Sequence, residues 1–248
     1  MLDDYVVVDL EMTGLHPKTD HILEIGAVKV REKQIIDTFS VLLRQDAPIP
    51  EQVAELTGIT DEMTADGQDA DRAVSAFLEF AEDLPWVGHN IIFDYSFIKQ
   101  WEVNHRIKRN CYAVDTLKIA RKCLPKEMKK SLESLRKYYG IEQTAIHRAY
   151  EDAAATQVLY EILEREFSKK EPGLFRSREL QCRLKRQTPA TARQKNYLKD
   201  LTEYHRIVLD VPVERLSRSE ASRLTDKIIA QYGKPEVSAV PGKKTIRP

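Results

Sequence analysis

The sequence contains no long hydrophobic run. No segment approaches the roughly 18 consecutive apolar residues that mark a membrane-spanning helix, and the first residues, Met-Leu-Asp-Asp-Tyr, lack the basic start of a secretory signal peptide. Cysteine is also scarce. Cys111, Cys123 and Cys182 show no metal-ligand spacing, and one of them would be left over from any pairing. These absences predict a cytoplasmic protein with reduced thiols and no membrane attachment.

The formal net charge is zero, but the charges are unevenly distributed. Residues 1–168 carry 20 Lys and Arg against 30 Asp and Glu, whereas residues 169–248 carry 19 against 9. Such asymmetry between halves suggests an acidic body and a basic arm that contacts nucleic acid. Two oppositely charged solvated surfaces that meet in the fold are the alternative.

The hydrophobic pattern changes along the chain. Short β-branched runs predict strands, and apolar positions with a helical period predict helices. The expected strands are 5–12, 22–30, 34–43, 86–89 and 112–114, and the expected helices are 50–56, 69–84, 92–103, 115–123, 131–139 and 148–168. Three strands followed by strands alternating with helices are typical of an α/β domain with a mixed sheet flanked by helices. We therefore expect a five-stranded mixed sheet within a domain over residues 1–168.

The remaining residues have a different composition. Residues 169–188 contain Pro172-Gly173 and scattered charges, which predicts a basic linker. A small helical module is expected over 189–233, with helices at 190–204 and 217–232. The second of these helices starts with a capping box, Ser217-Arg-Ser-Glu220. So short a module has little core of its own and is expected to pack on a partner or on the main domain. Residues 234–248 are predicted to be a disordered tail.

Four acidic residues in three segments suggest a common site. Asp9 and Glu11 alternate along the first strand, so their side chains point to the same face, about 6.6 Å apart along the strand. Asp94 follows His89-Asn90, and Asp152 lies near the start of the helix at 148–168. Carboxylates brought together repel one another unless cations neutralise them, and hard oxygen ligands suit Mg²⁺ or Mn²⁺. Two such ions about 3.5–4 Å apart are the usual apparatus for displacement at phosphorus, so we predict a metal-dependent nuclease.

Each acid also has an ordinary alternative. Asp9 and Glu11 could be solvated residues at a strand end, and Asp94 could cap the following helix. The adjacent Glu151 competes with Asp152 for the same role.

His147 lies five residues before Asp152. On a continuous helix, five residues rotate about 500°, which leaves the two side chains roughly 140° apart. We therefore expect His147 in the loop before the helix, from which it approaches the site separately. Histidine titrates near neutrality and can act as a general base on water. A capping or surface histidine is the alternative.

Three segments carry a resemblance to a known family. Asp9-Leu-Glu-Met-Thr-Gly-Leu15, His89-Asn-Ile-Ile-Phe-Asp94 and His147-x4-Asp152 resemble the three signatures of the DEDDh exonucleases, most closely the epsilon-type proofreading subunits of bacterial DNA polymerase III. The resemblance implies a ribonuclease-H-like fold and two-metal hydrolysis from the 3′ end of DNA. It implies one ion bridged by Asp9 and Asp152, a second near Glu11 and Asp9, and His147 as the general base.

The resemblance also implies contacts with substrate and partners. It assigns the terminal nucleotide to Leu10, Met12 and Thr13, and the scissile end to His89, Asn90 and Phe93, although each could equally be a packing or turn residue. The expected partners are single-stranded or frayed DNA 3′ ends, and a separate polymerase chain or another protein at the C-terminal module.

Met12 departs from the epsilon pattern. Proofreading enzymes usually carry a second threonine there, and the first motif reads like that of oligoribonuclease. The second motif and the basic appendage argue for DNA. An RNA-trimming exonuclease therefore remains as the alternative, together with an inactive nucleic-acid-binding scaffold, against which the filled catalytic positions argue.

Overall fold

The computed structural model describes residues 1–142, 148–209 and 211–235. The chain forms two compact units, Met1–Arg186 and Gln187–Pro248. The first unit is built on a six-stranded mixed sheet in the order β3-β2-β1-β4-β5-β6. Its strands are β1 (Tyr5–Met12), β2 (Ile22–Arg31), β3 (Gln34–Leu42), β4 (Trp86–Gly88), β5 (Tyr112–Asp115) and β6 (Arg178–Glu179).

The helices of the first unit connect and cover these strands. They are α1 (Glu51–Thr57), α2 (Asp61–Ala65), α3 (Ala70–Ala81), α4 (Ile92–Asn104), α5 (Thr116–Cys123), α6 (Leu132–Tyr139), α7 (Ala149–Phe167) and the 3-10 turn η1 (Pro172–Leu174). The predicted five strands and main helices are present within a few residues of their expected bounds. The sequence analysis missed α2, η1 and β6.

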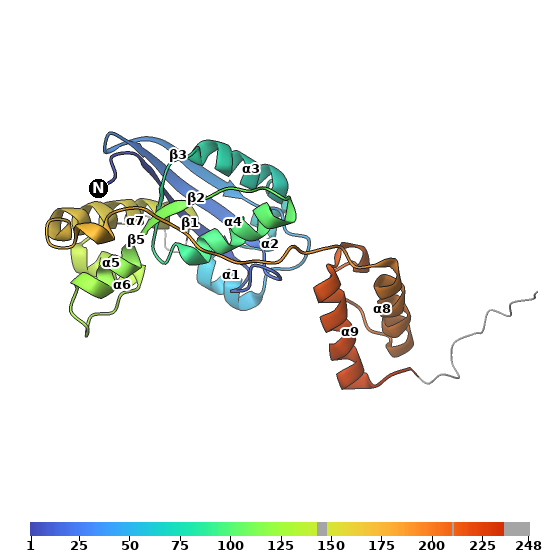
Figure 1. Cartoon of the computed structure of the whole chain (residues 1–248). Coiled ribbons are helices and arrows are strands. Elements are labelled where there is room, and N and C mark those ends of the chain that lie inside the picture. The colour runs from blue at the N-terminus through green and yellow to red at the C-terminus, as the bar shows by residue number, and fades with distance from the viewer. Residues whose placement is uncertain (143–147, 210, 236–248) are drawn as a thin grey trace, which may run out of the picture. The chain divides into compact units, whose positions relative to one another are not determined.

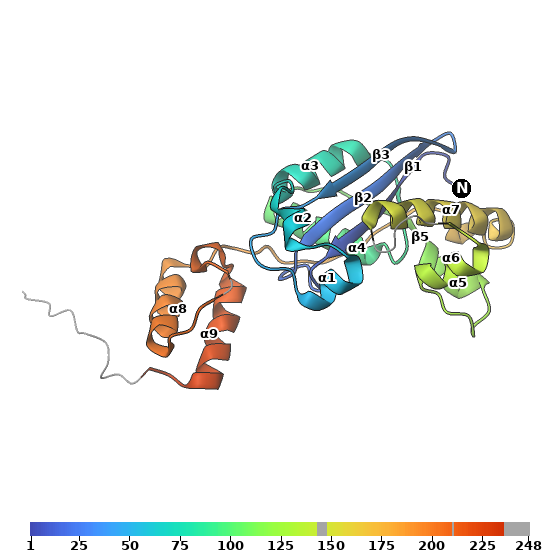
Figure 2. The ribbon, with the colours of Figure 1, turned by 180° about the vertical axis from the view of Figure 1, so that it is seen from behind.

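Different helices cover the two faces of the sheet (Figures 1 and 2). Val6, Val8 and Leu10 of β1 join a core with α3 and α4. Tyr5 and Val7 of the same strand join a second core with α5, α6 and α7. Because strand side chains alternate, Asp9 and Glu11 extend the row of Tyr5 and Val7 and lie on the face that α7 covers.

The strand pairing leaves part of β1 open at one edge. β1 pairs antiparallel with β2 along its whole length, with Asp9 opposite Gly26 and Glu11 opposite Glu24. On its other edge, β1 pairs in parallel with β4 only at Val6 and Val7. Among the described residues, the last part of β1 therefore has no strand partner on that side.

Residues 169–186 belong to the first unit, although the sequence suggested a linker over 169–188. Phe175 is fully buried in the second core, with its ring 6.3 Å from that of Tyr160. β6 pairs antiparallel with β5 at Tyr112 and Ala113. Further on, the Lys185 carbonyl accepts a hydrogen bond from Gln100 of α4. Tertiary contacts along most of this stretch thus hold it in place.

The second unit contains two helices and a 3-10 turn: α8 (Ala192–His205), η2 (Val213–Arg215) and α9 (Arg218–Tyr232). Both helices begin with a complete capping box, at Thr191 and at the predicted Ser217. Their apolar faces form a small core that includes Leu198, Leu201 and Ile228. Tyr232, the last residue of α9, is 51% exposed.

No helix in the described part of the chain has both the length and the apolar character needed to cross a membrane. Cys111, Cys123 and Cys182 are all free thiols. The predicted disordered tail lies almost entirely outside the described residues, which end at position 235.

Candidate active site

Three of the predicted acids meet at the end of β1. Asp9 and Glu11 come from the strand, and Asp152 comes from the first turn of α7, where its N–H bonds to the Arg148 carbonyl. Each of the three offers a carboxylate oxygen, and these oxygens all lie within 4.8 Å of one another. Asp152, rather than Glu151, is the helix acid in this group. The cluster is therefore a candidate site for metal binding.

Asp94 lies beside this cluster and is held by the backbone of β1. Its Oδ1 accepts a hydrogen bond of 3.0 Å from the Leu10 N–H. That N–H is available because β4 stops at Gly88 and pairs with β1 only at Val6 and Val7. Asp94 is 5% exposed, and its charge contributes to the shifted pKa of Asp9. Asp94 thus reaches the cluster from α4, on the other side of the sheet.

Burial and mutual repulsion change the proton affinity of these acids. Burial, followed by the charges of Asp94, Asp152 and Glu11, raises the pKa of Asp9 well above its usual 3.8. Burial and the charges of Asp152, Glu24 and Asp94 raise the pKa of Glu11 to about 8. Burial raises the pKa of Asp94 to about 7, although its backbone hydrogen bonds act in the opposite direction. A cation among these oxygens would relieve both effects.

Of the residues expected beside the scissile end, two are held within the fold. The ring nitrogens of His89 lie 2.9 Å from Thr116 Oγ1 and 2.7 Å from the Lys130 carbonyl, and burial lowers the pKa of its ring. The exposed Asn90 has a positive φ of 70° and donates its N–H to Asp115. Phe93 is half-buried, with its ring 5.7 Å from that of Phe97. Their contact with substrate remains a prediction.

The residues expected near the terminal nucleotide differ in exposure. Leu10 is buried in the first core, so only its backbone faces the site, and Met12 packs against that core from its edge. Thr13 closes the turn that follows β1. Its N–H donates to the His21 carbonyl, and its Oγ1 accepts from the His21 N–H at 2.8 Å. His147 lies outside the described residues, so its expected role is untested by the geometry.

The sequence analysis did not select Glu24. This residue is 1% exposed, lies opposite Glu11 on β2 and accepts hydrogen bonds from the Arg148 guanidinium. A signal was present: Glu24 is an acid inside the apolar run from Ile22 to Val30, and buried charges are normally paired. The partner could not be read from the sequence because it is 124 residues away.

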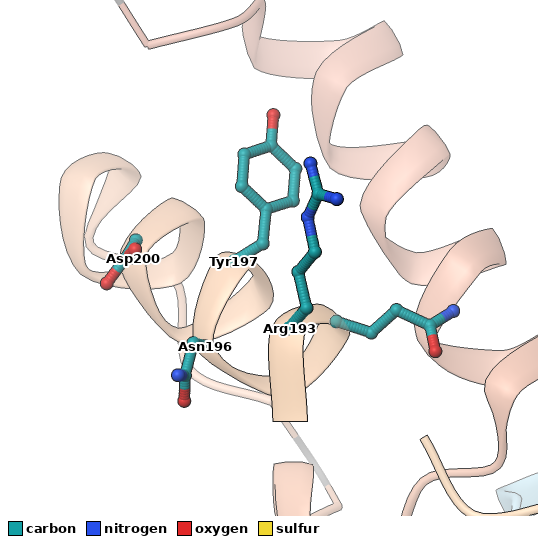
Figure 3. A pocket seen from close by; sticks show the side chains of 5 residues that line it. Arg193, Asn196, Tyr197 and Asp200 are labelled. Carbon is teal, nitrogen blue, oxygen red and sulfur yellow. The ribbon is translucent and has the colours of Figure 1, made fainter. Parts of the chain in front are cut away.

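A pocket in the second unit lies on α8 (Figure 3). It is lined by Arg193, Gln194, Asn196, Tyr197 and Asp200, and Figure 3 shows Arg193 and Tyr197 extending in the same direction. Asp200 supplies a single carboxylate to this lining, whereas three carboxylates converge at the end of β1. The acidic cluster on β1 and α7 is therefore the stronger candidate for catalysis.

Comparisons with known proteins agree with the three motifs. A family model described as Exonuclease (RNase_T) matches residues 6–160. The DNA polymerase III subunit epsilon of Aquifex aeolicus is 35% identical over 162 residues, which cover 64% of this chain and 80% of that protein. The PolC-type DNA polymerase III of Clostridium perfringens is 38% identical over 169 residues, which cover 67% of this chain. This chain spans only 11% of the length of that polymerase.

Solved structures show the same fold. Exonuclease X in complex with 5′ overhanging duplex DNA is 25% identical, with a TM-score of 0.53 over 66% of this chain and 92% of that one. Exonuclease I has a TM-score of 0.59 at 22% identity, over 70% of this chain and 42% of that one. The predicted α/β fold class and the resemblance to epsilon-type exonucleases are thereby confirmed.

Proposed function

The chain belongs to the exonuclease family, and on this premise we propose that it removes nucleotides from the 3′ end of DNA by metal-dependent hydrolysis. The observation that carries the proposal is the convergence of Asp9, Glu11 and Asp152, whose carboxylate oxygens lie within 4.8 Å of one another. The names of the relatives, a polymerase subunit and polymerases, support DNA over RNA as the substrate.

The residues present fit divalent cations. All donors in the cluster are hard carboxylate oxygens, which favour Mg²⁺ or Mn²⁺. Burial, followed by the charges of neighbouring acids, raises the pKa of Glu11, and a cation would favour its ionised form. We infer that Asp9 and Asp152 would hold one ion and that Asp9 and Glu11 would hold a second, with Asp94 contributing directly or through water. When bound, such ions lower the pKa of the attacking water and stabilise charge on the phosphate.

The protein's own contribution is proton transfer and positioning. His147, one residue before Arg148 and five before Asp152, would accept the proton of the attacking water. The backbone around Met12 and Thr13 would hold the terminal nucleotide, with Leu10 beneath it. His89, Asn90 and Phe93 would lie beside the scissile end. DNA ends that are single-stranded or frayed suit such a site, and a separate polymerase chain is the proposed protein partner.

A digestion series tests the proposal. The substrates are single-stranded DNA, duplex DNA with a mismatched 3′ nucleotide, fully paired duplex DNA and short RNA, each labelled at the 5′ end. We expect a ladder shortened stepwise from the 3′ end on the first two substrates, with activity lost in chelator and restored by Mg²⁺ or Mn²⁺. Asp152→Asn is the matched inactive control, because it keeps the size of the side chain while removing its charge.

Each other outcome has a defined meaning. Faster digestion of short RNA than of any of the three DNA substrates would indicate that RNA is the substrate and would support the oligoribonuclease-like alternative. Full activity in chelator would refute metal dependence. Binding of DNA without cleavage under all metal conditions would leave the inactive scaffold.

A further inference from the structure

Helix α7 begins without a capping side chain of its own. Its N-cap residue is Arg148, which makes no side-chain capping hydrogen bond. The first N–H groups of a helix need acceptors, and Ser, Thr, Asp or Asn usually supply one at this position. Here the acceptor comes from another element: the Ala149 N–H donates to Glu24 Oε2 of β2 at 3.1 Å. Glu24 therefore caps α7 from the neighbouring strand.

The same carboxylate also binds the side chain of the N-cap residue. Arg148 Nε donates to Glu24 Oε2 at 3.0 Å, and Arg148 Nη2 donates to Glu24 Oε1 at 2.8 Å. This two-point pairing fixes orientation as well as distance. Glu24 is 1% exposed, whereas the Arg148 side chain is 35% exposed, so the carboxylate is shielded from solvent and the guanidinium is only partly so. With a longer bond of 3.3 Å from Arg148 Nε to Oε1, four hydrogen bonds to one buried carboxylate thus hold the start of α7.

The strand approaches the helix closely beside this contact. Gly26 lies two residues after Glu24, on the same face of β2 and opposite Asp9. A Cβ atom built on Gly26 would lie 2.0 Å from the Ala149 carbonyl carbon and 2.1 Å from the Tyr150 nitrogen. No side chain fits there, so the backbone of the helix start lies directly on the strand that pairs with the Asp9 segment.

The helix start that makes these contacts also carries Asp152. Asp152 is in the first turn of α7, and its N–H bonds to the carbonyl of Arg148. We propose that the Glu24–Arg148 ion pair positions Asp152 over the Asp9–Glu11 pair. This inference rests on the proposed metal-dependent function. It gives Glu24 and Arg148 a positioning role and no contact with substrate.

A purely electrostatic role predicts a different result. If the pair acted only through charge, Glu24→Gln would weaken Mn²⁺ binding by removing a negative charge near the acids, whereas Arg148→Gln would strengthen it. A positioning role predicts that both variants weaken Mn²⁺ binding, and that the double variant is no worse than either single one. The two single substitutions therefore distinguish the mechanisms by the sign of one effect.

The chain offers a matched control elsewhere in the first unit. Glu102 is 0% exposed and bonds to Arg109 Nε at 2.7 Å and to Lys99 Nζ at 3.0 Å. Glu102→Gln also breaks a buried ion pair, but at the C-terminal part of α4, and so reports the general cost of such a change. It should lower thermal stability without altering Mn²⁺ affinity or kcat.

Three measurements on the full chain test the proposal. Calorimetry gives the Mn²⁺ affinity, hydrogen exchange gives the protection of the Ala149 amide against amides further along α7, and digestion of single-stranded DNA gives kcat and KM. For Glu24→Gln and Arg148→Gln we expect weaker Mn²⁺ binding. We also expect kcat to fall by about 10- to 100-fold, because misplacing a catalytic group by about 1 Å has an effect of this size. KM should change much less. For Glu24→Ala we expect faster exchange at Ala149.

Opposite shifts of Mn²⁺ affinity in the two single variants would overturn positioning in favour of charge. Unchanged affinity and kcat in both would reduce the pair to a structural contact and also overturn it. A wild-type chain that binds Mn²⁺ but digests nothing would refute the proposed function. The affinity and exchange measurements would still decide the inference in that case.

Discussion

Removing divalent metal should make the stability of the first unit fall as the pH rises from 5 to 8. In the folded protein the pKa of Glu11 is about 8 and that of Asp94 about 7, and the pKa of Asp9 is well above 3.8. In the unfolded chain these carboxyls titrate near pH 4. Between these values the folded state binds more protons than the unfolded state, so raising the pH costs the folded state free energy.

The magnitude follows from the same pKa values. For Glu11, a pKa of about 8 against an ordinary 4.5 corresponds to about 4 to 5 kcal/mol, because each pH unit is worth about 1.4 kcal/mol. The carboxyls share one repulsion and titrate as a coupled group, so their contributions do not add. We therefore expect a total loss of about 3 to 5 kcal/mol between pH 5 and pH 8. At about 2 to 4 °C per kcal/mol, the melting temperature should fall by about 10 °C.

Tryptophan fluorescence measures this loss selectively. The chain has two tryptophans, Trp86 and Trp101, and both lie in the first unit. Melting in chelator at pH 5 and pH 8 gives the pH dependence. Mn²⁺ at 100 times its pH 8 dissociation constant should add about 2.7 kcal/mol at pH 8. The same Mn²⁺ concentration should raise the melting temperature less at pH 5, where protons compete more strongly for the carboxylates.

The control variant is Glu11→Gln, which should flatten much of the pH dependence because it removes the carboxyl whose pKa is raised to about 8. A chelated wild-type protein whose melting temperature is equal or higher at pH 8 would show that the acids are ordinarily ionised, and the reasoning would fail.

Three further predictions concern other parts of the chain. Asp94→Asn should keep the fold, because an amide oxygen can still accept from the Leu10 N–H, but should lower kcat by about 100-fold or more; circular dichroism and a digestion assay check both. Phe175→Ala should cost the first unit about 3 to 5 kcal/mol in the tryptophan melt, because the buried ring leaves a cavity; no change would mean that residues 169–186 do not stabilise it. Truncation after Arg186 should leave kcat on a dinucleotide within about twofold of its value in the full chain. If residues 187–248 bind nucleic acid, truncation should also reduce the slope of log KM against log salt concentration by about 0.7 for each phosphate that this module neutralises. An unchanged slope would assign this module to a protein partner instead.

Local patterns were sufficient to predict the main elements of the site. Alternation along β1 predicted that Asp9 and Glu11 share a face, and the structure brings their oxygens together. The five-residue spacing predicted that the helix starts after His147, and α7 begins at Ala149. Both predictions depend on the geometry of a single element, which the sequence determines through its period.

Contacts between distant segments could not be predicted in the same way. β6 has two residues and therefore no alternation to detect, and its pairing with Tyr112 depends on where the chain returns after α7. Glu24 is a single acid within a strand, and its partner, Arg148, is 124 residues further along the chain, so no local pattern joins the two. Phe175 carried a signal that was overlooked, since a large aromatic residue in a charged segment favours burial.

The acids stay together because contacts independent of their charge hold the elements that carry them. Asp9 and Glu11 lie in a strand paired along its length with β2, and α7 is held against the sheet by buried apolar residues such as Leu159 and Leu163. Repulsion among the carboxylates therefore cannot separate them by a small local movement, and instead appears as raised pKa values. The start of α7 lies next to the repelling charges, although Tyr150 and Ala153 also pack against the second core. The two-point ion pair between Arg148 and the buried Glu24 adds a restraint at that position, which is why the position of Asp152 should be most sensitive to substitution of these two residues.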